Sequence, residues 1–336
     1  MPFLSETPSI RCSRPLFAAI LANTLLSTVP GISGAGPSPE KTLLTPNLDA
    51  ELVTSGTIWS RPARPDTPTG CPTPASITRA ATQLAGQVPL LIDAGLAEPP
   101  AVPCIDLHAS PGGDPRLGTA VPDAARLIEG GRMIGRFLSG ISDLLVLGEC
   151  VPGGTTTALC VLRALGYPAR VSSSFVVNPT GRKEEVVRTV LERMGTPGLL
   201  DPVAVLRETG DPMMPVAVGI AQSYQGTLLL AGGTQYLAVA AVLRALGDAP
   251  PSLVTTTYVR DDPTANFAEI AGLIGVRPLY VDPGFGDLGH AGLARYCIGE
   301  VKEGMGAGGA LALALLLGHS PDEIRAHVLA TVRSYS

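Results

Sequence analysis

A repeated pattern in the middle of the chain constrains the fold more than any other feature. The apolar run at 144–147 has the composition of a buried strand, and Gly153-Gly154-Thr155 follows it shortly afterwards. A helix then leads to the six residues Val-Leu-Arg-Ala-Leu-Gly at 161–166, whose glycine is a good C-terminal stop. The same order returns over residues 228–247, with Gly232-Gly233-Thr234 and an identical six-residue end. Two such strand–loop–helix units predict a parallel sheet.

The repeat extends past both helices. The segment 169–175 is strand-like and ends in small hydroxyl side chains, and 253–258 repeats it with three threonines. Short apolar strands that alternate with helices predict a doubly wound α/β fold, a parallel sheet with helices on both faces. Right-handed crossovers place the strand-to-helix loops along one edge, where ligands bind. The elements expected after the two segments are helices at 182–195 and 264–274 and a strand at 278–281.

The N-terminal part of the sequence is less regular. The apolar stretch 16–26 follows two arginines, like a weak signal peptide, but Asn23 and Thr24 interrupt it, and we favour a buried strand or helix followed by a loop. The proline-rich phrases at 61–66 and 98–100 predict loops, and helices are expected around 76–85 and 122–140. We predict that residues 1–120 pack on the core and contribute to a smaller, mainly helical part. Residues 121–336 form the nucleotide-binding core.

Composition excludes several classes of protein. With 45% hydrophobic residues, the chain has ample material for a large core and is not mostly disordered. A net charge of −5 without a long basic run disfavours a nucleic-acid partner. The apolar run 310–317 is too short to span a bilayer, so no membrane partner is expected. Six cysteines without a CxxC pair favour a reducing cytoplasm, and four scattered histidines predict no metal site.

The glycine-rich loops are candidate phosphate sites. Glycines allow close backbone approach, and the first N–H groups of a helix are unpaired and carry partial positive charge. No Gly-Lys-Ser/Thr follows, so these are not Walker loops, and a plain helix cap is the alternative. Lys183 is a possible point charge for a phosphate or simply a solvated helix residue. The ligand-binding candidates are Gly153, Gly154, Thr155, Thr156, Ser172, Ser173, Ser174, Lys183, Gly232, Gly233, Thr234, Gly304 and Gly306.

Two carboxylates are candidate catalytic residues. Glu303 precedes a third glycine cluster and an apolar helix, so it either caps that helix or, where partly desolvated, accepts a proton. Glu149 ends a predicted strand at the active edge, with a structural hydrogen bond to the loop as the alternative. Asp201, Asp211 and Asp282 precede prolines and are predicted mainly to form turns.

Several longer phrases of the sequence carry a family resemblance. The chain resembles the nicotinate-nucleotide:dimethylbenzimidazole phosphoribosyltransferase family of cobalamin assembly, and is most similar to the branch found in archaea and cyanobacteria. The resemblance covers nearly the whole chain, which makes the N-terminal apolar stretch part of the fold. The matching segments are 30–36, 78–80, 148–158, 210–215, 230–235 and 302–309.

The resemblance implies an activity and roles for individual residues. The family transfers phosphoribose from nicotinate mononucleotide to a benzimidazole-type base and releases nicotinate, without a metal or redox cofactor and as a dimer. Glu303 matches its general base and Glu149 a second carboxylate near the ribose and base. The glycine loops, Ser172 to Ser174 and Lys183 match donor-binding segments.

The chain also departs from the family. It has Val-Pro-Gly-Gly-Thr-Thr at 151–156 where the bacterial enzymes have Gly-x-Gly-Asn-Thr-Thr. This difference keeps open a non-catalytic nucleotide-binding or assembly protein on the same scaffold. A different glycosyl transfer, such as nucleoside phosphorolysis, is a third hypothesis.

Overall fold

A single seven-stranded sheet organises the molecule. The computed structural model describes residues 2–6, 8–36, 38–195 and 201–335. Within these ranges the strand order is β3-β2-β1-β4-β5-β6-β7, and every neighbouring pair is parallel. The strands are β1 (Pro15–Leu21), β2 (Leu90–Asp93), β3 (Ile105–Asp106), β4 (Leu144–Cys150), β5 (Thr227–Ala231), β6 (Ser252–Thr256) and β7 (Leu279–Val281).

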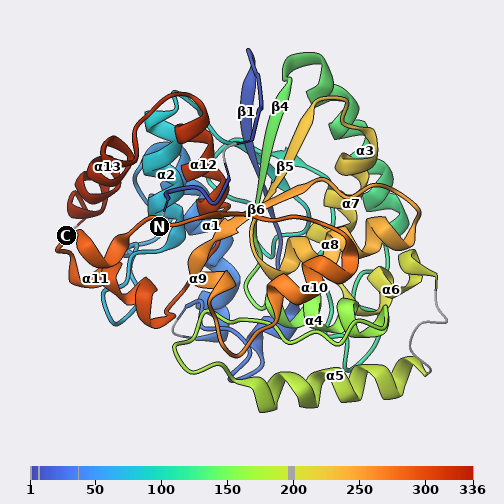
Figure 1. Ribbon diagram of the computed structural model, residues 1–336. Coiled ribbons are helices and arrows are strands. Elements are labelled where there is room, and N and C mark those ends of the chain that lie inside the picture. The colour runs from blue at the N-terminus through green and yellow to red at the C-terminus, as the bar shows by residue number, and fades with distance from the viewer. Residues whose placement is uncertain (1, 7, 37, 196–200, 336) are drawn as a thin grey trace.

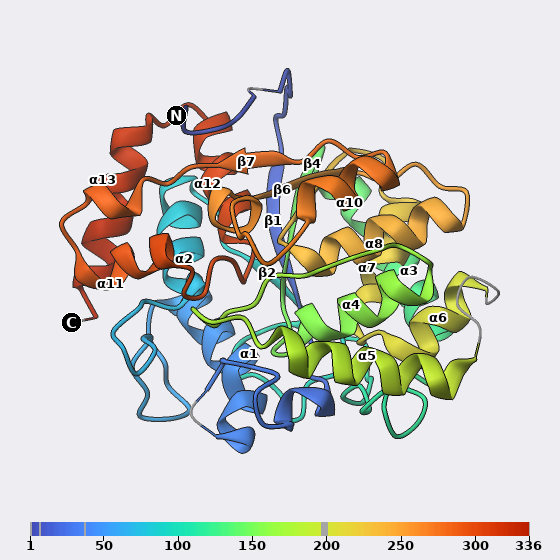
Figure 2. The ribbon, with the colours of Figure 1, turned by 60° about the horizontal axis from the view of Figure 1, so that its bottom comes forward.

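Helices cover both faces of this sheet (Figure 1). One face carries α2 (Pro74–Leu84), α12 (Ala307–Leu316) and α13 (Pro321–Arg333), and the other carries α3 (Ala124–Ile141), α7 (Met213–Ser223), α8 (Thr234–Ala245) and α10 (Phe267–Ile274). Turning the molecule brings α1 and α5 forward along one side (Figure 2). The other helices are α1 (Pro39–Ser55), α4 (Gly154–Ala164), α5 (Thr180–Met194), α6 (Pro202–Thr209), α9 (Thr257–Arg260) and α11 (Ala291–Ala294), with 3-10 helices at Leu25–Thr28, Phe285–Asp287 and Arg295–Ile298.

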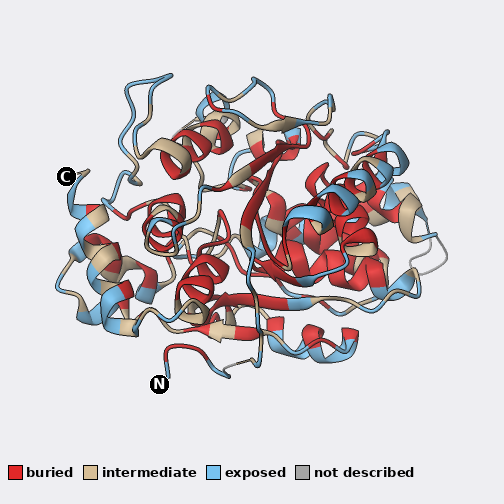
Figure 3. Cartoon of the chain, turned by 90° about the horizontal axis from the view of Figure 1, so that it is seen from above, coloured by how far each residue is buried: buried red, intermediate tan, exposed pale blue. Residues whose placement is uncertain are grey.

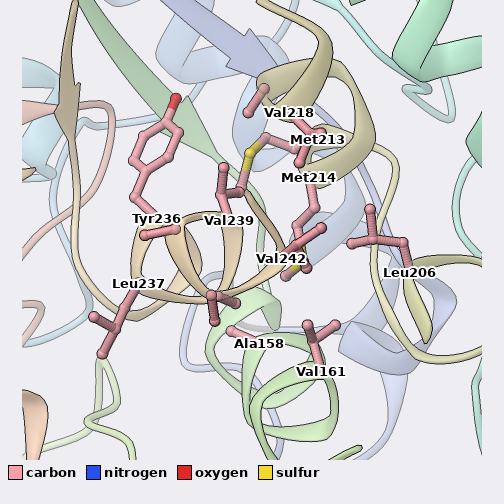
Figure 4. Packing of buried hydrophobic residues seen from close by; sticks show 14 of the residues in the cluster. Ala158, Val161, Leu206, Met213, Met214, Val218, Tyr236, Leu237, Val239 and Val242 are labelled. Atoms are coloured by element: carbon pink, nitrogen blue, oxygen red, sulfur yellow. The ribbon is translucent and has the colours of Figure 1, made fainter. Parts of the chain in front are cut away.

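The core divides into two clusters because successive strand residues point to opposite faces. In β4, Leu144 and Val146 belong to the cluster under α12, whereas Leu145 and Leu147 belong to the cluster under α7 and α8. The central strands β4, β5 and β6 are buried along nearly their whole length (Figure 3). Figure 4 shows the second cluster, in which Val161 of α4, Met214 of α7 and Val242 of α8 lie close together.

The predicted fold class is confirmed, and so are the repeated units. The two repeated loops lead into α4 and α8, which pack against each other, and the glycine after each helix, Gly166 or Gly247, has a positive φ. The N-terminal apolar stretch contains β1, which pairs with β2 on one side and β4 on the other. A strand at the centre of the sheet explains why this stretch is so apolar.

The expectation of a strand at 169–175 is wrong. These residues form irregular chain with bends, although Ser172 and Ser173 are buried. The strand that precedes this segment along the chain, β4, already pairs with β1 and β5, so it offers no free edge. The corresponding segment of the second unit forms β6 because β5 does have a free edge there.

The N-terminal third supplies more of the sheet than the sequence indicated. Neither α1 nor the strands β2 and β3 were expected, yet β1, β2 and β3 all precede residue 120. The loops predicted at 61–66 and 98–100 are present. The two predicted segments therefore share one sheet, and a boundary near residue 120 remains a prediction.

Candidate active site

A cavity of about 1050 Å³ opens at the carboxyl ends of the central strands. Its wall includes residues 32–36, which follow β1, and residues 149–155, at the end of β4 and the start of α4. The strand order reverses between β1 and β4: β2 and β3 follow on the outer side of β1, whereas β5, β6 and β7 follow on the outer side of β4. Open α/β sheets bind ligands at such a point.

The N-termini of two helices face this cavity. Gly153 is the N-cap of α4. Its φ of 79° is a backbone conformation that residues with a Cβ atom rarely adopt. Gly233 and Thr234 bring the start of α8 to the same wall. The two loops touch, because a Cβ atom added at Gly154 would lie 2.7 Å from Nε2 of Gln235. Unpaired backbone N–H groups of both helices are thus available to an anion.

Glu149 lies at the carboxyl end of β4 and is only 2% exposed. Gln235 donates from Nε2 to its Oε2 over 3.2 Å. Burial, together with the nearby carboxylates of Asp211 and Glu303, raises the pKa of Glu149 to about 8. Glu149 is therefore largely protonated at neutral pH in the absence of a cationic ligand.

Glu303 lines the same cavity from the loop before α12. Its Oε1 accepts hydrogen bonds of 3.2 Å from the backbone N–H groups of Gly304 and Gly308, and Thr255 donates to Oε2 over 3.4 Å. Burial raises its pKa to about 7, against the lowering effect of these donors. Both alternatives considered for Glu303 hold together: it caps α12 and also presents a basic carboxylate to the cavity.

The loop around Glu303 has an unusual backbone. Val301, Lys302 and Met305 have φ values of 66°, 65° and 51°, a left-handed conformation that costs free energy for residues other than glycine. Such strain persists only where surrounding contacts enforce it.

Three hydrogen bonds hold this strained loop in place. Thr256 donates to the carbonyl of Lys302 over 2.7 Å, and Thr78 donates to the carbonyl of Met305 over 3.0 Å. The N–H of Met305 donates to the carbonyl of Glu149 over 2.8 Å. The main chains that carry the two candidate carboxylates are therefore directly bonded.

Two buried lysines hold the Ser172–Ser174 segment. Lys183 donates from Nζ to the carbonyl of Ser172 and, over 3.2 Å, to Oγ1 of Thr155. Lys302 donates to the carbonyl of Ser173 over 2.7 Å. These bonds replace the sheet pairing that the segment lacks. Burial, together with the charge of Lys302, lowers the pKa of Lys183 to about 7.

The structure brings most of the predicted site residues to one wall and leaves four behind it. Those that line the cavity are Glu149, Gly153, Gly154, Thr155, Ser172, Ser173, Ser174, Gly233, Thr234, Glu303 and Gly304. Within the described part of the chain, the four behind the wall are Thr156, Lys183, Gly232 and Gly306. Lys183 contacts the wall through Thr155 and the carbonyl of Ser172, and its predicted contact with a phosphate remains a prediction.

Sequence reasoning missed two acidic residues of this region. Asp211 is fully buried and its Oδ2 accepts from Thr157 over 2.6 Å, so it supports α4 from behind in addition to preceding a turn. Asp49 lines the cavity from α1. The spacing of polar and apolar residues along 41–49 could have indicated that helix, but Pro46 within it disguises the pattern.

Two kinds of feature are absent from the ranges that the structure describes. No three His, Cys, Asp or Glu side chains there form a group able to hold a metal ion. None of the helices there has the length and apolar character needed to cross a membrane.

The sequence is similar to archaeal proteins. No family model matches the chain. The UPF0284 protein of Methanosarcina acetivorans is 43% identical over 338 aligned positions, and the alignment covers 98% of this chain and 97% of that protein. A UPF0284 protein of Methanothermobacter thermautotrophicus is 43% identical over 327 aligned positions, with 93% of this chain and 91% of that protein covered. The chain belongs to the UPF0284 family.

This UPF0284 member shares its fold with solved enzymes. The crystal structure of a nicotinate-nucleotide-dimethylbenzimidazole phosphoribosyltransferase from Thermus thermophilus superposes with a TM-score of 0.64 at 19% identity, over 95% of this chain and 83% of that one. A second structure, of CobT from the same organism, gives 0.63 at 18% identity, over 95% and 84%. The predicted resemblance is confirmed at the level of the fold.

Proposed function

We propose that this UPF0284 member is a phosphoribosyltransferase that moves phosphoribose from nicotinate mononucleotide to an aromatic nitrogen base in cobamide assembly. The observation that carries the proposal is the meeting of Glu149, Glu303 and the N-termini of α4 and α8 on one cavity. The likeness of the fold to a solved enzyme of this activity supports it. We also propose a cytoplasmic location, which the six free cysteines support.

The donor nucleotide suits this wall of the cavity. Its phosphate is an anion, and the first turns of α4 and α8 offer backbone N–H groups at Thr155 and Thr234. Its pyridinium ring and the ribose carry positive charge in the transition state. Glu149 would lie beside that charge, and a cationic ligand lowers the pKa of a carboxyl group and favours its anion.

The reaction needs one base and no acid. The glycosidic bond from C1′ to the pyridine nitrogen breaks. Its electron pair stays on that nitrogen, so nicotinate leaves with a neutral ring. A ring nitrogen of the acceptor forms the new bond to C1′, and its proton goes to Glu303. A base that works near neutral pH requires a pKa close to 7, which burial gives Glu303. No electrons are transferred, so the chemistry calls for no redox cofactor.

Release of nicotinate tests this proposal. Purified protein is incubated with nicotinate mononucleotide and a panel of benzimidazoles and purines, and nicotinate and the new nucleotide are separated by chromatography. We expect nicotinate and the phosphoribosylated base in equal amounts. Calorimetric binding of the nucleotide without turnover by any base would instead favour a non-catalytic binding protein. Phosphate-dependent cleavage of nucleosides would point to phosphorolysis.

The proposal includes pairing of two copies of the chain. On α3, Met133, Phe137 and Ile141 recur every four residues and are 61%, 61% and 49% exposed. Large apolar side chains in such a stripe are typical of an interface. In an antiparallel pair of α3 helices about a two-fold axis near residue 133, Glu129 would face Arg136 of the partner subunit, so the charges beside the stripe are complementary.

A further inference from the structure

One face of α1 forms a wall of the cavity that no sequence motif indicated. The residues of this face follow the helical spacing i, i+3, i+4, i+7 and i+8: Lys41, Leu44, Thr45, Leu48 and Asp49. Leu44 and Leu48 are half-buried, so each keeps apolar surface open to the cavity. Apolar surface of this kind suits the flat face of an aromatic ring.

Asp49 lies at the inner end of this face and is only 8% exposed. Thr73 donates to its Oδ1 over 3.0 Å, and Cys150 donates from Sγ to Oδ2 over 3.6 Å. A carboxylate can accept about four hydrogen bonds, and a thiol is a weak donor. Among the ion pairs of the described residues, none involves Asp49. This buried acceptor is thus only partly satisfied by protein groups and faces open space.

Asp49 lines the same cavity as both candidate catalytic carboxylates. Its partner Cys150 directly follows Glu149 in β4. Its other partner, Thr73, precedes Pro74, whose Cγ lies 3.2 Å from where a Cβ atom of Gly304 would be, next to Glu303. Glu303 and Asp49 therefore line one cavity, which at about 1050 Å³ is large enough for a bicyclic base.

Resting on the proposed function, we propose that Asp49 selects the acceptor base. The acceptor is a fused bicyclic aromatic base that carries an O–H or N–H donor on the edge opposite its attacking nitrogen, as hydroxybenzimidazoles and aminopurines do. Its ring packs on Leu44 and Leu48, and its donor binds the free lone pairs of Asp49. Asp49 is a specificity residue and takes no part in proton transfer.

The expected size of the selectivity depends on how the site disfavours a base without the donor. A pocket that only loses or gains a methyl group discriminates by roughly 10–200-fold. A site whose buried polar group is left unpaired by the wrong ligand discriminates by up to about 10⁴–10⁵-fold. Because Thr73 and Cys150 already satisfy part of Asp49, we expect a preference of about 100-fold or more for the donor-bearing base.

Two matched pairs of bases test the inference. With saturating nicotinate mononucleotide, kcat/KM is measured for 5-hydroxybenzimidazole against 5-methylbenzimidazole, and for adenine against purine. The wild-type protein should prefer the donor-bearing member of at least one pair by about 100-fold. Asp49→Leu should reduce this ratio to about one. The isosteric Asp49→Asn should reduce this ratio by about tenfold or more. It replaces the leucine variant as the test if that variant does not fold.

Asp93→Asn is the control. Asp93 is also 8% exposed, but among the described residues it does not line the cavity, and it accepts from the backbone of Gly95 and Leu96. The ratio should remain unchanged in this variant. A wild-type ratio of one or less for both pairs, or a ratio that survives both Asp49 substitutions, would overturn the inference.

The failure of this inference can be told apart from failure of the proposed function. If no base supports nicotinate release, the proposed reaction is wrong. Calorimetric titration with the four bases then still decides the role of Asp49. Tighter binding of a donor-bearing base, lost in Asp49→Asn, would support the site, and equal or absent binding of all four would exclude it.

Discussion

Glu303 shows how one side chain can serve the fold and the chemistry together. Its Oε1 accepts hydrogen bonds from the backbone N–H groups of Gly304 and Gly308, and Glu303 also lines the cavity. Glu303→Gln keeps an oxygen for these N–H groups and removes the basic site. We expect kcat to fall by about 10²–10⁴, the usual effect of a lost general base, with the thermal midpoint nearly unchanged. Nicotinate release and circular dichroism measure the two effects.

The outcome for Glu303 is informative in either direction. Glu184→Gln is a suitable control, because Glu184 is a half-exposed partner of Arg163. That control should keep the wild-type rate. A Glu303→Gln variant with the wild-type rate would remove this residue from the role of general base.

The buried carboxylates also make a prediction about stability and pH. The pKa values of Glu149 and Glu303 rise from an ordinary 4.5 to about 8 and about 7, mainly through burial. At these two side chains the folded chain therefore holds more protons than the unfolded chain between about pH 5 and 8. Linkage then requires the free energy of unfolding to fall as pH rises through this window. In ligand-free protein, urea unfolding should show this fall, and Glu149→Gln should flatten it.

The measurement is specific to the cavity. Glu149→Gln retains an oxygen for Gln235, so the variant should fold normally. Nicotinate mononucleotide should also reduce the pH dependence if its positive ring favours the carboxylate anion. A pH dependence that is identical in the wild type and Glu149→Gln would show that Glu149 is not buried as a proton-binding group.

Among the elements, the crossing of α3 and α7 depends on two glycines. A Cβ atom at Gly131 would lie 2.2 Å from the carbonyl oxygen of Val216, and one at Gly219 would lie 2.0 Å from that of Ile128. The two helix backbones are in direct contact, so Gly131→Ala must push them apart. We expect a loss of about 1–3 kcal/mol or more in the free energy of unfolding, measured with urea.

Gly272→Ala provides the matched comparison. Gly272 lies within α10, and a Cβ atom there would meet no heavy atom within 4 Å. Alanine at such a helical position should stabilise the chain by about 0.4–1 kcal/mol, since it reduces the freedom of the unfolded state. Equal effects of the two substitutions would contradict the close approach of α3 and α7.

Elements whose type is determined by residues close together in the sequence were predictable. A strand, a glycine turn and a helix with a glycine stop lie within about twenty consecutive residues in each repeat, and both became β–α units. The segment 169–175 has the same local character, but whether it pairs depends on a free sheet edge, which β4 does not have. Local patterns therefore predicted the kind of element, and pairing partners decided whether it formed.

The same distinction applies to the candidate site. Glu149 and Glu303 stand beside glycine-rich turns, so their position at the active edge could be inferred from their neighbours in sequence. Asp49 reaches the cavity through Cys150 and Thr73, and Asp211 supports α4 through Thr157. These contacts join residues that are far apart in the chain, and no local pattern encodes them.

At the scale of the whole molecule, the N-terminal third and the repeated units form one sheet with the cavity at their junction. β1, from the N-terminal third, pairs with β4 of the first repeat along its full length, with Ile20 opposite Glu149. The cavity takes one wall from α1 and the other from the starts of α4 and α8. Neither part alone would enclose a ligand.

The exposed stripe on α3 makes the last prediction, which concerns assembly. Figures 1 and 2 place α3 well away from α1, so pairing through this helix would leave the cavity open. Phe137 is 61% exposed and central in the stripe. In Phe137→Glu a carboxylate would be buried without a cationic partner among the apolar side chains of the interface, a cost that an interface held by apolar contacts cannot offset. We expect a dimer in the wild type and a folded monomer in the variant by sedimentation velocity.

Val88→Glu separates a loss of pairing from a general effect of added charge. Val88 is 74% exposed and lies in the loop after α2, far along the chain from the stripe. This variant should remain dimeric, because its new carboxylate stays in water. A wild-type chain that sediments as a monomer at about 50 μM, above the dissociation constants usual for specific homodimers, would contradict the pairing. So would a Phe137→Glu variant that remains dimeric, since the stripe would then lie outside the interface.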